Sequence, residues 1–166
     1  EYSKEEKKLG TAGGLGLLKN KLEDDFLVMN GDVLTGLDFS EFLEFHKKTG
    51  SIATIALNRR HVDIDFGVVE LDENRTLIGY IEKPKIDYLV SMGVYAFNES
   101  ILEYIPSHEY LDIPDLMKRL LSEGEKVNGF IHDGYWLDIG RPDDYIKANE
   151  DIQKIYRELG VSIDEA

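Results

Sequence analysis

The feature that most restricts the fold is a short apolar run, residues 26–29, followed at once by Asn30-Gly31-Asp32. Four consecutive apolar residues that end in turn residues are typical of a strand buried on both faces, as in a parallel sheet. An amphipathic stretch, 38–48, comes next and is closed by Gly50, and the β-branched segment 51–57 follows it. Strand, helix and strand within roughly 30 residues predict a βαβ unit with parallel strands, and therefore an α/β fold.

The remainder of the chain predicts shorter strands and helices. Two strands, 66–71 and 76–82, are separated by the polar turn 72–75, which predicts a hairpin. Beyond them we expect strands at 88–98, 127–132 and 136–139 and helices at 101–105, 113–122 and 142–159. No repeat, linker or low-complexity stretch interrupts the sequence. Residues 1–166 are therefore predicted to form a single domain that is doubly wound at first and partly antiparallel afterwards.

A helix is also predicted near the start of the chain, over 9–22, with Thr11 as its N-cap. Gly13, Gly14 and Gly16 fall inside it, and each glycine destabilises a helix by about 1 kcal/mol relative to alanine. We therefore expect a close approach to the backbone at this helix start. Two interpretations stay open: a planar ring or phosphate that lies on the bare backbone, or tight packing against another helix.

The composition excludes several classes of protein. With 166 residues, 42% of them apolar, the chain can bury one core. Its formal net charge of −14 argues against a nucleic-acid-binding protein, which needs a basic face. No apolar run reaches the roughly 18 residues of a membrane span, so no membrane partner is expected. The absence of cysteine removes disulfides, thiolate metal sites and cysteine nucleophiles, and it is compatible with a cytoplasmic protein.

The histidines give no sign of a metal or nucleophilic site. His46, His61, His108 and His132 lack metal-ligand spacing, and no serine lies in a nucleophile elbow. We interpret these four side chains as ordinary surface or core histidines.

Two aspartates stand where a metal ion could bind. Asp32 follows the apolar strand 26–29, and ligands of open parallel sheets bind beyond the carboxyl ends of the strands. Asp138 lies between Leu137 and Ile139 in a short apolar strand, where a buried carboxylate needs a partner. One interpretation is a Mg²⁺ ion shared by both carboxylates. The other is an ordinary turn at Asp32 and a helix cap at Asp138.

A further pair of candidates ends the strand 76–82. Pro84 favours an extended Lys83, which places the carboxylate of Glu82 and the ammonium of Lys83 on opposite faces. Lys83 could bind a phosphate as a point charge, and Glu82 could accept hydrogen bonds from sugar hydroxyls. The alternative is a solvated strand end without a ligand.

In their order along the chain, these segments resemble the sugar-phosphate nucleotidylyltransferase family, the nucleotide-sugar pyrophosphorylases, and within it the mannose-1-phosphate guanylyltransferase and glucose-1-phosphate thymidylyltransferase branch. The segments that carry the resemblance are Leu9-Gly10-Thr11-Ala12-Gly13, Phe26-Leu27-Val28-Met29-Asn30-Gly31-Asp32, Phe66-Gly67-Val68-Val69, Glu82-Lys83-Pro84, Met92-Gly93-Val94-Tyr95 and Trp136-Leu137-Asp138-Ile139-Gly140. The resemblance covers about the whole chain. It implies a Rossmann-like mixed sheet of the nucleotide-diphospho-sugar transferase type.

The same resemblance implies roles for particular residues, with a nucleoside triphosphate and a sugar-1-phosphate as substrates. The expected nucleotide contacts are Gly10, Thr11, Ala12 and Gly13. The expected sugar-phosphate contacts are Gly67, Glu82, Lys83 and Gly93. Mg²⁺ would be held by Asp32 and Asp138, and the catalytic residues would be Asp32, Lys83 and Asp138.

The family also begins with a strand and a glycine-rich loop, Gly-x-Gly-Thr-Arg-Leu, followed by a Pro-Lys pair, and these have no counterpart in this sequence. We therefore expect an N-terminally truncated chain, the C-terminal two-thirds of a nucleotidyltransferase domain, that is inactive on its own. The strand 26–29 would then keep an unpaired edge, which favours self-association or a homo-oligomer.

Two other functions stay open. A non-catalytic nucleotide-sugar-binding or regulatory paralogue would keep the fold without the activity. A glycosyltransferase of related fold would carry an Asp-x-Asp metal motif, a form that Asp63-Ile64-Asp65 has, although this segment is predicted to be a loop before Phe66.

Overall fold

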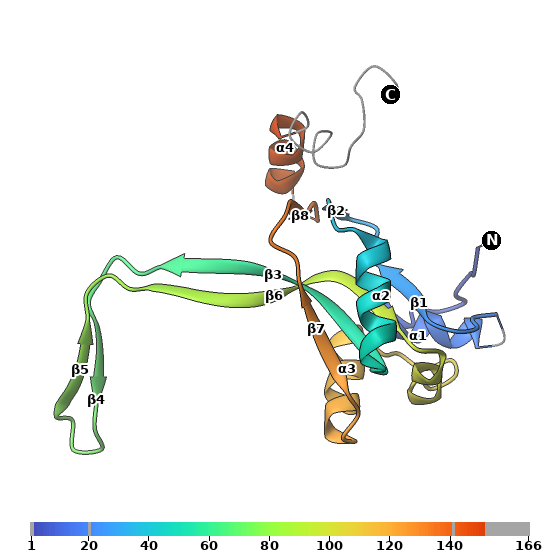
Figure 1. Cartoon of the computed structure of the whole chain (residues 1–166), viewed down its shortest axis with the longest axis horizontal. Coiled ribbons are helices and arrows are strands. Elements are labelled where there is room, and N and C mark those ends of the chain that lie inside the picture. Colours follow the sequence, from blue (N-terminus) through green and yellow to red (C-terminus); the bar gives the residue numbers. More distant parts are fainter. Residues whose placement is uncertain (1, 20, 141, 152–166) are drawn as a thin grey trace.

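A computed structural model of the chain describes residues 2–19, 21–140 and 142–151. Its main sheet has the strand order β1–β6–β3–β7 (Figure 1). These strands are β1 (Phe26–Met29), β6 (Lys85–Phe97), β3 (Ala53–Asp63) and β7 (Val127–Ile131). β6 is antiparallel to both β1 and β3, whereas β3 and β7 are parallel. The sheet is therefore mixed, and β1, β3 and β7 all run in one direction.

The two strands of the predicted βαβ unit, β1 and β3, run parallel as expected, but the expectation that they pair directly is wrong, because β6 lies between them. β1 forms one edge of the described sheet rather than a strand buried on both faces. Leu27 is 38% exposed and Met29 is 48% exposed, while Phe26 and Val28 pack against the core. An apolar run identifies a strand, but it carries no information about which strand lies beside it.

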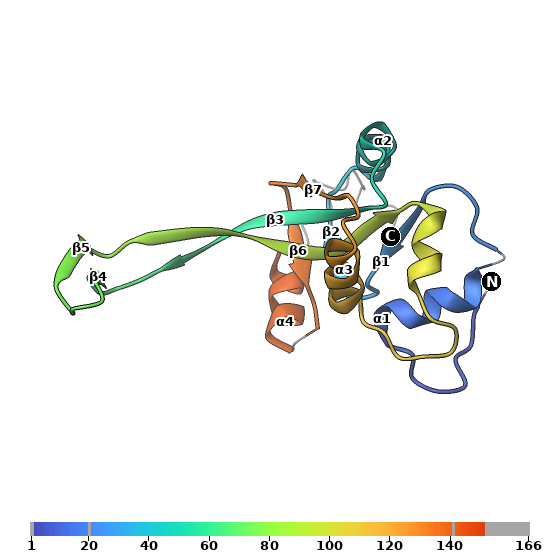
Figure 2. The same ribbon diagram turned by 90° about the horizontal axis from the view of Figure 1, so that it is seen from below.

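Helices cover both faces of the sheet (Figure 2). The helix α2 (Phe39–Thr49) begins after Asp38, whose side chain accepts hydrogen bonds from two backbone amides, and ends at Gly50 in a left-handed conformation, as predicted. The other face carries α3 (Ile113–Ser122) and the 3₁₀ helix η2 (Glu99–Tyr104).

The two faces bury separate apolar clusters because successive side chains of β6 point to opposite faces. Tyr95 and Phe97 pack with α3 and η2, whereas Met92, Val94 and Ala96 pack with α2. The result is a three-layer arrangement in which β6 is the central strand of the core.

The start of the chain folds differently from the predicted helix 9–22. It forms a single helical turn, α1 (Gly10–Gly13), followed by a 3₁₀ helix, η1 (Gly14–Leu18). The turn has no side-chain cap, so Thr11 is not an N-cap. The glycines inside the segment explain the short helices, because each one weakens α-helix propagation.

Beyond the sheet, β3 and β6 continue together as a two-stranded arm (Figures 1 and 2). At its end lies the predicted hairpin, formed by β4 (Val68–Leu71) and β5 (Leu77–Ile81) in antiparallel pairing. The register of β3 and β6 shifts between Ile55 and Leu57, so that Met92, Gly93 and Val94 of β6 form a bulge opposite Ala56. This bulge separates the sheet from the arm.

The remaining elements are short. β2 (Val33–Thr35) pairs with β8 (Trp136–Asp138), and α4 (Pro142–Glu150) follows. The rest of the predicted helix 142–159, from residue 152, lies outside the described residues. Within the described ranges, no helix is both long and apolar enough to span a membrane.

Candidate functional site

Asp32 and Asp138, far apart in the sequence, lie together at the carboxyl edge of the sheet. The short β2–β8 ladder places Val33 opposite Asp138, and the amide of Ile139 donates to the carbonyl oxygen of Asp32 over 2.9 Å. A Cβ built on Gly140 would lie 3.0 Å from Asp138 Oδ1 and 3.4 Å from Asp32 Oδ2. Both carboxylates therefore face the same small space, at the edge where open α/β sheets bind their ligands.

An open pocket of about 410 Å³ surrounds the two carboxylates and is here named the carboxyl-edge pocket. Its lining includes Asp32, Arg60, Trp136, Asp138, Gly140 and Asp144. Asp32 and Asp138 are exposed, so the prediction that Asp138 is buried is wrong. One of its oxygens, Oδ1, accepts a hydrogen bond from the amide of Gly140 over 2.9 Å.

The donor set of this pocket fits Mg²⁺. This ion uses one or two protein carboxylates and fills its other positions with water or substrate phosphates. Asp32 and Asp138 are exposed and provide those two carboxylates without a closed cage. Among the described residues, no larger cluster of three or more His, Cys, Asp or Glu suited to a metal occurs.

Gly93 lies beside this edge, in the bulge of β6. Its φ is +74°, and a Cβ there would lie 2.8 Å from Asn30 Nδ2. The amide of Asn30 donates to the carbonyl oxygen of Gly93 over 2.9 Å. The indole Nε1 of Trp136 donates to the carbonyl oxygen of the preceding Met92 over 3.0 Å. The structure thus brings Gly93 together with the loop that carries Asp32.

The segment Gly10–Gly13 packs against its own chain. A Cβ on Gly10, where φ is +78°, would lie 2.6 Å from the Leu111 carbonyl oxygen, and one on Gly13 would lie 2.6 Å from that of Glu109. The amides of Ala12 and Gly13 both donate to the Leu111 carbonyl oxygen. The close approach predicted from the glycines is therefore made by this backbone, which accounts for them without a ligand.

Thr11 and Asp112 tie the same two segments together. The amide and hydroxyl of Thr11 donate to Asp112 Oδ1 over 2.9 and 3.2 Å, and Tyr110 donates to Asp112 Oδ2 over 2.6 Å. The hydrogen bond from Tyr110, followed by that from the Thr11 amide, lowers the pKa of Asp112.

Gly67, Glu82 and Lys83 gather at the junction of the arm and the β4–β5 hairpin. The hydroxyl of Tyr80 donates to Glu82 Oε2 over 2.8 Å, which raises the pKa of Tyr80. A Cβ on Gly67 would collide with this Tyr80 hydroxyl. Lys83 has a φ of +45°, so the extended conformation expected before Pro84 is wrong.

The arm carries this second group away from the sheet, whereas Asp32 and Asp138 lie at the sheet itself (Figure 1). The structure therefore places the predicted metal and sugar-phosphate residues in two separate clusters. Asp63 of the Asp-x-Asp segment also lies on the arm, where it faces His61 at 3.9 Å and Lys85 at 4.0 Å.

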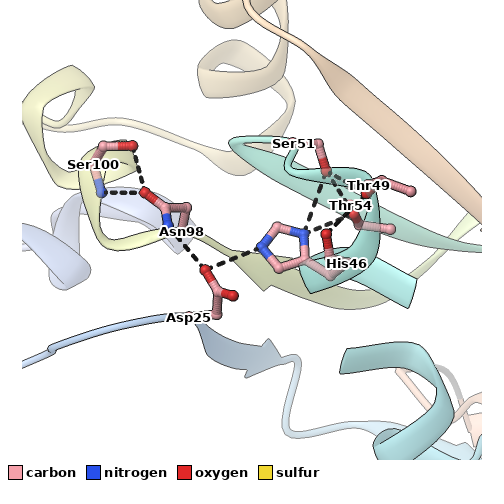
Figure 3. A network of polar contacts seen from close by, with 7 residues as sticks. All are labelled: Asp25, His46, Thr49, Ser51, Thr54, Asn98 and Ser100. Atoms are coloured by element: carbon pink, nitrogen blue, oxygen red, sulfur yellow. Dashed lines mark hydrogen bonds and ion pairs between the residues drawn. The ribbon is translucent and has the colours of Figure 1, made fainter. Parts of the chain in front are cut away.

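A buried polar network occupies the opposite edge of the sheet, where the parallel strands begin (Figure 3). His46 of α2 is 1% exposed, and its Nδ1 lies 2.8 Å from Thr54 Oγ1 and 3.4 Å from Ser51 Oγ. Its Nε2 lies 3.7 Å from Asp25 Oδ1, which also accepts from Asn98 over 2.9 Å. His46 is thus a core histidine with partners on both ring nitrogens.

Sequence reasoning missed Arg60, which lines the carboxyl-edge pocket. Its guanidinium carbon lies 4.7 Å from the ring centroid of Trp136, and its Nη2 donates to the Trp136 carbonyl oxygen over 3.4 Å. A usable signal was its position at the carboxyl end of a predicted strand, the same signal that singled out Asp32.

Comparisons with known proteins identify the family of this chain. The family model described as Nucleotidyl transferase matches residues 1–155. A mannose-1-phosphate guanylyltransferase of Mycobacterium tuberculosis is 33% identical over 158 residues, which cover 92% of this chain and 44% of that protein. The bifunctional protein GlmU of Methanococcus maripaludis is 35% identical, over 90% of this chain and 37% of that protein. The chain thus spans less than half the length of these curated relatives.

Solved structures show the same likeness. HddC from Yersinia pseudotuberculosis is 26% identical with a TM-score of 0.64, and the match covers 89% of this chain and 64% of that one. A second structure of HddC, in complex with GMP-PN, is 25% identical with a TM-score of 0.61. Because the family model matches nearly the whole chain, this protein belongs to the nucleotidyl transferase family.

Proposed function

We propose that this chain provides the Mg²⁺ and sugar-phosphate part of a sugar-1-phosphate nucleotidylyltransferase. The reaction joins a nucleoside triphosphate to a sugar-1-phosphate and releases a nucleotide sugar and pyrophosphate. The observation that carries this proposal is the convergence of Asp32 and Asp138 on one open pocket at the carboxyl edge of the sheet. The mannose-1-phosphate guanylyltransferase named above supports GTP and mannose-1-phosphate as the first substrate pair to test.

In this reaction the protein has to align the two substrates and neutralise their negative charge. A phosphate oxygen of the sugar-1-phosphate attacks the α-phosphorus of the triphosphate and pyrophosphate leaves, so no side-chain nucleophile is required. Asp32 and Asp138 would hold Mg²⁺ beside the phosphates. When bound, this ion neutralises the negative charge that the two substrates bring together.

The predicted sugar-phosphate contacts lie in two places that a single ligand must bridge. Gly93 lies beside the carboxylate pair, whereas Glu82, Lys83 and Gly67 lie on the arm. One sugar phosphate can therefore reach both groups only if the arm bends toward the sheet, and the bulge at Gly93 is where the ladder is already interrupted. Gly10–Gly13 stays a proposed nucleotide contact on the strength of the resemblance alone, since its close contacts are made with the backbone of Glu109 and Leu111.

The proposal is tested by binding and by turnover. Because the chain spans less than half of its relatives, binding of GDP-mannose with and without Mg²⁺, measured by calorimetry, is the primary readout. We expect Mg²⁺ to tighten binding, and Asp32→Asn or Asp138→Asn to remove most of that gain. Asp115→Asn, an exposed aspartate of α3 paired with Lys118, is the matched control and should bind as the unaltered chain does.

Pyrophosphate release from each of the four nucleoside triphosphates with mannose-1-phosphate or glucose-1-phosphate separates a catalyst from a binding protein. Turnover that needs both aspartates supports the enzyme, and Mg²⁺-dependent binding without turnover supports a non-catalytic role for the isolated chain. Nucleotide-sugar binding that ignores Mg²⁺ and both substitutions would contradict the proposal.

A further inference from the structure

The carboxyl-edge pocket has an unfavourable charge for the ligands of a nucleotidyl transferase. Three carboxylates line it, those of Asp32, Asp138 and Asp144, on a chain whose formal net charge is −14. An incoming phosphate group is repelled by these charges unless a cation lies close to it. Arg60 is the one basic side chain that lines this pocket within the described part of the chain.

Arg60 is held in place by Trp136 rather than by an acidic partner. The guanidinium lies over the indole ring at 4.7 Å, within the range of a cation–π interaction. Its hydrogen bond goes to the Trp136 carbonyl oxygen, and among the described residues no carboxylate lies within ion-pair distance of it. Most of its donors therefore remain available to a ligand.

Trp136 is itself fixed on two sides. Its backbone pairs with Thr35 in the β2–β8 ladder, and its indole Nε1 donates to the Met92 carbonyl oxygen in the bulge of β6. The ring that supports Arg60 therefore cannot turn freely. Stacking on such a surface reduces the side-chain freedom that an arginine loses when it binds a phosphate.

We propose that Arg60 is the phosphate-binding residue of the carboxyl-edge pocket and that Trp136 is the platform that orients it. The ligand class is a phosphate monoester or a diphosphate, which a planar guanidinium can bind through two parallel hydrogen bonds. This inference rests on the proposed function for the identity of the substrate, but not for the binding of phosphate itself.

The chain contains a built-in reporter for this proposal, because Trp136 is its only tryptophan. Fluorescence of Trp136 would be followed during titration with mannose-1-phosphate, with inorganic pyrophosphate and with mannose as the phosphate-free control. We expect saturable changes with either or both phosphate probes and none with mannose. The stronger responder distinguishes a sugar phosphate from a diphosphate as the ligand.

Three substitutions at two neighbouring positions test the role of Arg60. Arg60→Gln should raise the apparent Kd for the responding probe by about tenfold or more, since charge-assisted hydrogen bonds are lost. Arg60→Lys keeps the charge but not the planar fork, so its Kd should lie between those of the unaltered chain and Arg60→Gln. Arg59→Gln is the matched control, because Arg59 is exposed and already pairs with Asp133 at 3.2 Å, and it should change the Kd less than twofold.

Removing Arg60 also changes the emission of Trp136 directly, so each Kd would be confirmed by calorimetry, and circular dichroism would establish that the variants fold. The proposal is overturned if the unaltered chain shows no saturable response to either phosphate probe, if Arg60→Gln binds as tightly as the unaltered chain, or if Arg59→Gln weakens binding equally. Its failure is distinguishable from that of the proposed function, whose Mg²⁺ dependence is removed by Asp32→Asn rather than by Arg60→Gln.

Discussion

His46 is a buried titratable side chain whose pKa the fold shifts. Burial lowers its pKa, and the nearby carboxylate of Asp25 opposes this effect only in part, while Lys47 adds to it. The neutral ring then joins α2 to the starts of β1 and β3 through Asp25, Ser51 and Thr54 (Figure 3). The histidine therefore contributes to stability as a neutral polar group inside the core.

This contribution predicts a loss of stability in weak acid. The folded-state pKa of His46 lies below the unfolded value of about 6.5, so the unfolded chain binds more protons under that pH. Stability from this residue is complete above about pH 6.5 and falls as the pH drops, by at most ~1.4 kcal/mol per pH unit for one proton. Thermal unfolding at pH 7.5, 6.5 and 5.5 measures the fall.

Two histidine variants test this by how steeply their stability falls with pH, not by their absolute stability. His46→Gln should flatten the decrease between pH 6.5 and 5.5. His61→Gln, at an exposed histidine of the arm, should leave it unchanged. A decrease that persists unaltered in His46→Gln would show that other groups cause it.

At the scale of single elements, the bulge of β6 joins the sheet, the arm and the carboxyl-edge pocket. Gly93 adopts a φ of +74°, and its α-carbon faces the side chain of Asn30 at a distance that leaves no room for a methyl group. Gly93→Ala should therefore lower the free energy of unfolding by about 1–3 kcal/mol, through backbone strain and the collision together. Urea unfolding measures this difference.

Gly31→Ala is the control for that substitution. Gly31 lies in the adjacent loop, has no positive φ, and has open space where a Cβ would be added. We expect it to change the free energy of unfolding by less than about 0.5 kcal/mol, as is usual for unconstrained surface positions. Equal effects of the two substitutions would show that the bulge places no special requirement on Gly93.

Local signals in the sequence predicted where helices and strands lie along the chain better than they predicted which strands lie side by side in the sheet. The helix α2 follows its capping residues Asp38 and Gly50, and α3 has the predicted bounds 113–122. The position of β6 between β1 and β3 was not predictable, since it depends on long-range packing. The prediction of a helix over 9–22 was wrong because the glycines destabilise an α-helix more than the helical spacing of the leucines favours one.

The candidate site was predictable to a similar degree. The resemblance assigned Asp32 and Asp138 to one metal, and the three-residue β2–β8 ladder that brings them together could not be predicted, because three residues show no clear period. The separation of Glu82 and Lys83 from this pair follows from the length of the arm, and that length depends on pairing rather than on local sequence.

At the scale of the whole molecule, the arm is the feature without a covering layer (Figure 1). Large apolar side chains on both of its strands and on the hairpin are 38–77% exposed: Val62, Phe66, Val68, Val69, Leu71, Leu77, Ile78, Tyr80, Ile81, Ile86, Tyr88 and Leu89. They present on the order of 1,000 Å² of surface, comparable to the roughly 800 Å² that each partner buries in a stable interface.

We therefore predict that a second copy of the chain covers this arm, so that the chain is a dimer by light scattering at micromolar concentration. The double variant Phe66→Ser/Ile78→Ser should shift the population to monomer. Leu121→Ser, at a residue of α3 that is 62% exposed, should leave it dimeric. A monomer at every concentration would contradict the prediction, and a dimer insensitive to the arm would place the contact elsewhere, for example at the edge of β1.

Asp32 and Asp138 are expected to act as one cation-binding pair, and nuclear magnetic resonance with Mn²⁺ in place of Mg²⁺ tests this directly. Oxygen sites for Mg²⁺ accept Mn²⁺, and the paramagnetic ion broadens amide signals near it. We predict that substoichiometric Mn²⁺ broadens the signals of Gly31, Asp32, Ile139 and Gly140 first, that Mg²⁺ reverses the effect, and that either Asp32→Asn or Asp138→Asn abolishes it. Broadening centred on Asp63 of the arm, or spread evenly over the acidic surface and unchanged by both substitutions, would contradict the account.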